Sequence, residues 1–380
     1  MNDILILRHR YVPFQIAIFL FVVVAVFFFS IGLYFCIKTK NGPTPASDTS
    51  VKSIREDATQ RALSSMTIEE KVGQLFFFGI SGTTLSDDMY TLLHNTHAGG
   101  VLLMNKSLPQ TFQPVIASIR SLPSRIPLFI AYDGEIERMK SIDDTYDIQA
   151  RIAPDEEFCA MNRKIAKDLA DNGFTMNFGI IADIGWQQSG YITERTYGST
   201  VEDVTSKVRT ALRCSDGILN AVKHFPGHGT TADDSHTTIP VISNTLSEWE
   251  HADAIPFGQA FDMDVPVLMV GHLVYDAFDE TPASLSPKAH QKARAMGFNG
   301  IIITDDLHML ENQNRNPVDT FLSAVNAGND MVLYVTDNLE GVALYQNVLD
   351  AVRRGDISLA RIEESVLRIL RIKYLTLGSK

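Results

Sequence analysis

Apolar residues along the chain occur in short continuous runs separated by longer amphipathic stretches. Eight runs rich in β-branched, aromatic and aliphatic residues lie at 73–80, 98–105, 127–133, 174–184, 218–225, 265–273, 300–307 and 330–337. Amphipathic segments with polar starts lie between most of them, as at 154–174, 199–217 and 286–300, and several end at Gly, as helices tend to. Strands that are apolar throughout and alternate with helices indicate a parallel sheet buried on both faces.

The number of strand-helix units favours a closed α/β barrel over an open α/β sheet. Within residues 51–380, they suit a (β/α)8 TIM-type barrel better than an open, doubly wound sheet, which is the alternative. The pattern therefore predicts a single barrel domain over residues 51–380, large enough to be a catalytic domain.

The longest apolar segment precedes this globular part. Phe14 to Ile37 contains no charged residue, and a helix of that length crosses a hydrocarbon core of about 30 Å. We predict a short tail at 1–12, a transmembrane helix at 13–37 and a turn-rich linker at 38–50. A cleaved signal peptide is the alternative, although its apolar stretch is about 7–15 residues and ends at small residues. Basic residues on both sides leave the orientation undetermined.

Composition argues against a nucleic-acid partner and against a disulfide-based fold. The 380 residues carry a formal net charge of −12 and no basic run, so we expect no nucleic-acid partner. Of the three cysteines, Cys36 lies in the apolar leader, and a disulfide scaffold cannot be built. One bridge between Cys159 and Cys214 remains possible.

Ionisable residues stand at the ends of five consecutive apolar runs. They are Asp133, Asp183, Lys223 with His224, His272, and Asp305 with Asp306. Enzymes with a barrel fold carry their chemistry where the strands end, at the C-terminal face. We therefore predict that these side chains converge on one site.

The loop after the fifth run, KHFPGHGTTADDSH, carries candidate acid-base chemistry. Asp234 can orient the His236 ring and raise its pKa, which makes the imidazole a usable proton donor near neutral pH. The alternatives are a solvated loop with an Asx turn, or a metal site formed by His224, His228 and His236. Neither HExxH spacing nor a CxxC pair is present, so we expect no metal.

Asp305 is the candidate nucleophile. The run GIIITDDL places it at a strand end with few polar neighbours, where a carboxylate can be held rigidly under a substrate. Covalent attack on a sugar anomeric carbon requires such a group. The alternative role, capping the next helix, fits Asp306 better.

These motifs together resemble glycoside hydrolase family 3, in particular its single-barrel β-N-acetylglucosaminidase branch. The resemblance runs from MTIEEKVGQLFFFGI through AYDGEIER, ERTYGST, KHFPGHGTTADDSH and GIIITDDLHM to NAGNDMVLY, and covers nearly all of the globular part. KHFPGHG followed by DSH is its most specific element.

The resemblance implies roles for seven residues. Asp305 is similar to the family's nucleophile, and His236 with Asp234 resembles its acid/base dyad. Sugar-hydroxyl binders are implied at Asp133, Arg195, Lys223 and His224. In the loop after Asp133, Ile136 and Glu137 replace two glycines of the branch, so the shape of this loop is expected to differ.

The implied activity is retaining exo-hydrolysis of terminal β-linked N-acetylglucosamine or a related N-acetylhexosamine, from cell-wall-type or chitin-type glycans, without a cofactor. A phosphorolytic variant, an inactive membrane-tethered sugar-binding barrel and a metal-dependent hydrolase are the alternatives. With the predicted helix at 13–37, we expect a membrane-anchored enzyme whose catalytic domain lies outside the cytoplasm.

Overall fold

The computed structural model describes residues 48–377, apart from 105–106, 188–189, 232, 234–237 and 312–314. The transmembrane helix predicted at 13–37 and most of the predicted linker lie outside these residues. Within the described part of the chain, no helix is both long and apolar enough to cross a bilayer. The first described helix begins at Asp48, slightly before the predicted start of the globular part.

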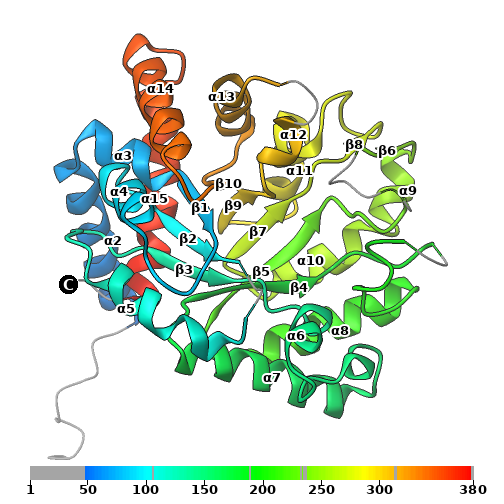
Figure 1. Ribbon diagram of the computed structural model, residues 1–380. Coiled ribbons are helices and arrows are strands. Elements are labelled where there is room, and N and C mark those ends of the chain that lie inside the picture. The colour runs from blue at the N-terminus through cyan, green and yellow to red at the C-terminus, as the bar shows by residue number, and fades with distance from the viewer. Residues whose placement is uncertain are drawn as a thin grey trace, which may run out of the picture. The chain divides into compact units, whose positions relative to one another are not determined.

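Eight parallel strands form the centre of the molecule, and each falls within one of the eight apolar runs (Figure 1). In chain order the strands are β1 (Phe76–Ile80), β2 (Gly100–Leu103), β3 (Phe129–Tyr132), β4 (Met176–Ile181), β5 (Leu219–Phe225), β7 (Val267–Val270), β9 (Ile301–Thr304) and β10 (Val332–Val335). A separate pair, β6 (Val241–Ile242) and β8 (Val274–Tyr275), forms a small parallel ribbon.

The strands follow one another around the sheet in chain order. Neighbours pair in the order β10-β1-β2-β3-β4-β5-β7-β9, and all of these pairs are parallel. The two ends of this order approach each other through a bridge between Ile303 and Met331 and a hydrogen bond from the Leu307 amide to the Leu333 carbonyl (2.9 Å). The sheet is thus a nearly closed (β/α)8 barrel, which confirms the predicted fold and excludes the doubly wound alternative.

Helices make up most of the rest of the described chain, and many of them lie around the outside of the strands (Figure 1). They are α2 (Asp48–Ser65), α3 (Ile68–Gln74), α4 (Asp87–Asn95), α5 (Gln113–Arg120), α6 (Ile136–Ile142), α7 (Asp155–Asp171), α8 (Val201–Cys214), α9 (Leu246–Glu250), α10 (Ala254–Asp262), α11 (Pro287–Ala295), α12 (His308–Glu311), α13 (Pro317–Ala327), α14 (Glu340–Arg354) and α15 (Leu359–Thr376). The helical segments predicted within 154–174, 199–217 and 286–300 are α7, α8 and α11.

Short polar signals set several helix starts. Thr67 forms a capping box with Glu70 at α3, in which each side chain accepts a hydrogen bond from the other residue's amide. The side chains of Thr200 and Ser286 accept amide hydrogen bonds in the first turns of α8 and α11. Each contact satisfies an N–H group that the helix itself leaves without a partner.

Alternation along the strands divides the core into two layers. In β1, Phe77 packs inside the barrel, whereas Phe76 and Phe78 pack between the strands and the helices. The same alternation separates Ile303 from Ile302 in β9. Successive strand side chains point to opposite faces, so a strand buried on both sides must be apolar at every position. This requirement explains why the runs in the sequence are continuous.

A disulfide joins two neighbouring outer helices. Cys159 of α7 and Cys214 of α8 are bonded, with their Cα atoms 5.4 Å apart. The bridge that the sequence left possible is therefore present, and it links positions 55 residues apart.

Candidate active site

Five of the predicted site residues line one pocket at the C-terminal end of the barrel. Asp133 follows β3, Lys223 and His224 lie in β5, Asp305 follows β9, and Arg195 comes from the segment between β4 and α8. The pocket is narrow, with about 50 Å³ open to a water-sized molecule. The structure thus brings together residues that the sequence spreads over the whole barrel.

Asp305 is fixed by the backbone that carries it. Its amide donates to the Val270 carbonyl of β7 (2.9 Å), and one carboxylate oxygen accepts from the Asp306 amide (2.8 Å). Burial raises the pKa of the Asp305 carboxyl, but His224, that amide and Lys223 outweigh the effect and leave the pKa below its usual value. Asp305 is therefore ionised at neutral pH, the form in which a carboxylate attacks carbon.

A buried carboxylate, Glu135, organises the cations of the pocket. Its side chain is 2% exposed and forms a bidentate pair with Arg195 through two 2.7 Å contacts. Lys223 Nζ lies 2.6 Å from the same carboxylate, and Arg138 Nε lies 3.3 Å from it. Burial raises the pKa of Glu135, yet Arg195 and Lys223 outweigh burial and hold the pKa well below its usual value.

Asp133 completes this network on the pocket side. Lys223 Nζ donates to it at 2.5 Å, and Arg138 Nε lies 3.0 Å from it. The carboxylates of Asp133 and Glu135 thus form one network of ion pairs with three cations, Arg138, Arg195 and Lys223. Their geometry is set before a ligand arrives, which suits them to recognise hydroxyl groups in one fixed arrangement.

Asp183 orients His224 from beneath. It is fully buried, accepts from the His224 amide and lies 2.7 Å from His224 Nδ1. Nδ1 therefore carries the proton, and the other ring nitrogen, Nε2, faces Arg195 Nη2 at a distance of 3.4 Å. Burial raises the pKa of Asp183, but His224 and His228 outweigh it and lower the pKa.

His272, at the end of β7, holds the backbone around the nucleophile. Its Nε2 donates to the Asp306 carbonyl at 2.9 Å, and its Nδ1 accepts from the Ser284 hydroxyl at 2.7 Å. Burial lowers the pKa of His272 despite the neighbouring Asp305, so the ring is neutral. This strand-end histidine positions Asp305 and Asp306, and both of its nitrogens are used in doing so.

The arrangement of strand-end carboxylates, cations and histidines can be compared with known proteins. Residues 67–372 match the family described as Glycosyl hydrolase family 3 N terminal domain. The chain belongs to glycosyl hydrolase family 3. The resemblance seen in the sequence is thereby confirmed, and this family 3 protein is a glycoside hydrolase.

Proteins similar to this family 3 chain include two β-hexosaminidases and a β-N-acetylglucosaminidase of known structure. A β-hexosaminidase of Alkalilimnicola ehrlichii is 29% identical over 307 residues, which cover 75% of this chain and 87% of the relative. Beta-hexosaminidase LpqI of Mycobacterium tuberculosis is 27% identical over 359 residues, covering 88% and 90%. A family 3 β-N-acetylglucosaminidase structure from Paenibacillus sp. str. FPU-7 matches with a TM-score of 0.76 at 27% identity, and covers 83% of this chain and 64% of that one.

The predicted acid/base dyad of the family 3 site, Asp234 and His236, lies outside the described residues. The described part of its loop includes His228, whose amide donates to Asp183 at 2.6 Å. Among described residues, no group of three or more His, Cys, Asp or Glu side chains is placed to hold a metal ion.

Sequence reasoning missed two charged residues of the ion-pair network at the family 3 site, Glu135 and Arg138, and one aromatic residue of the pocket, Tyr191. Tyr191 accepts a hydrogen bond from Arg138 Nη2 (3.1 Å), and the Arg195 guanidinium lies 4.7 Å from the centre of its ring. The alternating charges of DGEIER directly after a strand end were the available signal. That signal does not say which of Glu135 and Glu137 points inward.

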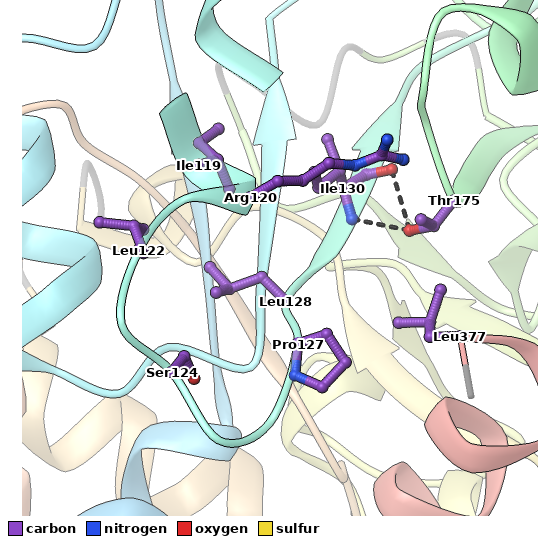
Figure 2. A pocket seen from close by; sticks show the side chains of 9 residues that line it. All are labelled: Ile119, Arg120, Leu122, Ser124, Pro127, Leu128, Ile130, Thr175 and Leu377. Atoms are coloured by element: carbon purple, nitrogen blue, oxygen red, sulfur yellow. Dashed lines mark hydrogen bonds between the residues drawn. The ribbon is translucent and has the colours of Figure 1, made fainter. Parts of the chain in front are cut away.

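A second pocket lies at the opposite end of the barrel, by the starts of β3 and β4 (Figure 2). Mostly apolar side chains line it, including Leu128 and Leu377, and Arg120 is the charged residue among them. The Thr175 hydroxyl bonds there to the backbone of Ile130, so it is already engaged. These residues offer no acid, base or nucleophile for chemistry on a sugar.

Proposed function

We propose that the protein is a retaining exo-β-N-acetylglucosaminidase that releases terminal β-linked N-acetylhexosamine through a covalent glycosyl-enzyme. One observation carries the proposal: an ionised, backbone-held Asp305 lies in one pocket with Asp133, Arg195 and Lys223. The buried Glu135 behind them holds Arg195 and Lys223 in place.

In the proposed mechanism, Asp305 attacks the anomeric carbon while the bond from that carbon to the leaving oxygen breaks. His236, oriented by Asp234, gives its proton to the leaving oxygen. In the second step, His236 takes a proton from a water molecule as the water oxygen attacks the anomeric carbon. The bond between that carbon and Asp305 then breaks, which frees the carboxylate. Bonds from the network to the sugar hydroxyls can tighten as positive charge develops on the ring, which lowers the barrier.

The proposed substrate class follows from the relatives. The names β-hexosaminidase and β-N-acetylglucosaminidase belong to proteins that match most of this chain. We extend them to this chain, with cell-wall-type or chitin-type glycans as the natural source of the terminal sugar.

The proposed location is the outer side of a membrane, with residues 13–37 as the anchor. The uncharged apolar segment supports an anchor. The Cys159–Cys214 disulfide supports the outer side, because structural disulfides persist in oxidising compartments and are rare in the cytosol.

The test is hydrolysis of 4-nitrophenyl N-acetyl-β-D-glucosaminide by the full-length protein in detergent. We expect Asp305→Ala to lower kcat by about 10⁴-fold or more, as loss of a nucleophile does. Asp262→Asn, an exposed aspartate in the last turn of α10, is the control and should match the parent. Equal activity of the Asp305 variant and the parent would refute the assigned nucleophile.

Product analysis separates the remaining alternatives. Proton NMR should show the β-anomer of N-acetylglucosamine first, since retention requires two inversions at the same carbon. Formation of the sugar 1-phosphate in phosphate buffer would establish the phosphorolytic variant. A folded parent protein that binds N-acetylglucosamine without turnover would indicate the binding-only barrel.

A further inference from the structure

We propose that His228 is a further substrate-positioning residue, whose imidazole hydrogen-bonds to a polar group of the bound sugar. The inference rests on the proposed function of the pocket as a sugar site. His228 lies in the turn after β5 and is one of the residues that line the same pocket as Asp305 and His224.

The imidazole of His228 is buried without a partner. The residue is 2% exposed, and neither Nδ1 nor Nε2 has a hydrogen-bond partner among the described residues. Buried polar atoms in native proteins are nearly always satisfied, because leaving one unpaired costs free energy. Two unused nitrogens on a pocket wall therefore indicate a group that arrives with the ligand.

Other polar side chains of the pocket are already engaged within the protein. His224 uses Nδ1 on Asp183, Arg195 uses two nitrogens on Glu135, and Lys223 contacts two carboxylates. Compared with these, His228 retains its whole hydrogen-bonding capacity for a ligand.

The position of the ring is set by the backbone rather than by its own contacts. The His228 amide donates to Asp183 at 2.6 Å, and this carboxylate also holds His224. The two rings lie 6.0 Å apart at an interplanar angle of 70°. At Gly229, an added Cβ would lie 1.6 Å from the Ile184 carbonyl oxygen, so the turn packs tightly against the segment after β4. A ligand group thus meets a prearranged imidazole.

The charge state defines what His228 can do. Burial lowers its pKa to about 4, so the ring is neutral near pH 7. Three charged or titratable groups face the ring: Asp183 raises the pKa of His228, whereas His224 and Arg195 lower it. A neutral imidazole offers one donor and one acceptor, which suits a sugar hydroxyl or the acetamido carbonyl.

The test compares His228→Phe and His228→Asn in the full-length protein. Phe removes both nitrogens, whereas Asn keeps a donor and an acceptor. We expect His228→Phe to lower kcat/KM by about 10–100-fold, the usual effect of losing one or two hydrogen bonds to substrate, with Asn in between. The pH profile of kcat/KM should keep its shape between pH 5 and 8, because the lost group is neutral there.

The control is His290→Phe. His290 is a buried histidine of α11 that has an unpartnered Nε2 but does not line the pocket. Its variant should change the melting temperature without changing KM. A His228→Phe protein with kcat/KM within twofold of the parent, or with a loss that follows only its melting temperature, would overturn the proposal.

Binding measurements keep this test separate from the proposed hydrolysis. Calorimetry with N-acetylglucosamine should show weaker binding to His228→Phe even if the parent catalyses no turnover. Glucose as a second probe distinguishes the two contacts. A loss shared by both sugars assigns His228 to a ring hydroxyl, and a loss for N-acetylglucosamine alone assigns it to the acetamido group. Unchanged affinity for both sugars would refute the positioning role.

Discussion

Glu135 holds the cationic side of the pocket together. A single buried carboxylate contacts Arg195, Lys223 and Arg138, and it stands behind the side chains assigned to the sugar. We regard it as a positioning residue, because its oxygens are occupied by protein cations. Its neighbour in the same loop, Glu137, is only half-buried.

Replacing Glu135 with Gln should therefore affect both folding and activity. The isosteric amide leaves the buried Arg195 without its carboxylate and Lys223 with Asp133 alone, so we expect the free energy of unfolding to fall by about 3–5 kcal/mol. We also expect kcat/KM to fall, and thermal unfolding together with steady-state kinetics measures both effects. Glu137→Gln is the matched control, and similar losses in both variants would contradict the special role of Glu135.

The pH dependence of this effect has a definite sign. The folded-state pKa of Glu135 lies well below its unfolded value. Its stabilising contribution is therefore fully present above about pH 4.3 and is lost as pH falls below that value. The stability gap between the parent and Glu135→Gln should be constant from pH 6 to 8 and should shrink below pH 4.

Among the elements, α15 closes the N-terminal end of the barrel. Ile369 packs with the interior cluster of the strands, and Lys373 follows one turn later, fully buried. Lys373 Nζ donates to the Gln74 side chain (2.8 Å) and the Gly99 carbonyl (2.7 Å), and it lies over the Phe129 ring. None of its hydrogen-bond partners in the described chain is a carboxylate.

This buried lysine should make stability depend on alkaline pH. Burial lowers the folded-state pKa of Lys373 well below its usual value. Between this lowered folded-state pKa and the unfolded value of about 10.4, the unfolded chain binds more protons than the folded one, so stability should rise with pH across that interval, by at most about 1.4 kcal/mol per pH unit. Lys373→Met should lose this slope in thermal unfolding. Lys71→Met, at a lysine paired with Glu363 at 2.7 Å, should keep it; a parent protein without the slope would show that Lys373 is charged when folded.

At the scale of the whole molecule, the Cys159–Cys214 disulfide makes stability depend on the redox state of the surroundings. It crosslinks α7 and α8 on the outside of the barrel, while the pocket residues follow the strand ends. The bridge should therefore matter for stability and much less for catalysis.

Replacing both cysteines with Ser should lower the free energy of unfolding by about 2–4 kcal/mol while kcat stays near the parent value. Reductant should lower the melting temperature of the parent protein and leave the double variant unchanged. Mass spectrometry after thiol labelling of native membranes gives the complementary measurement. Two labelled thiols at these positions would argue against a location outside the cytoplasm.

The sequence by itself determined the barrel. A strand buried on both faces is apolar at every position, and this local property is visible as eight continuous runs without knowledge of their partners. The ends of those runs then identified Asp133, Lys223, His224 and Asp305, because parallel strands in a barrel end at one face. These expectations needed only local patterns and one rule of topology.

Tertiary structure decided what local pattern could not. Glu135 and Glu137 are the same residue type two positions apart, and only the approach of Arg195 and Lys223 from other segments makes Glu135 the anchor of the cations. Both His224 and His228 donate their amides to Asp183, but only the His224 ring pairs with that carboxylate, whereas both ring nitrogens of His228 lack a partner among the described residues. Such differences depend on contacts between segments far apart in the chain, and those contacts exist only once the barrel has closed.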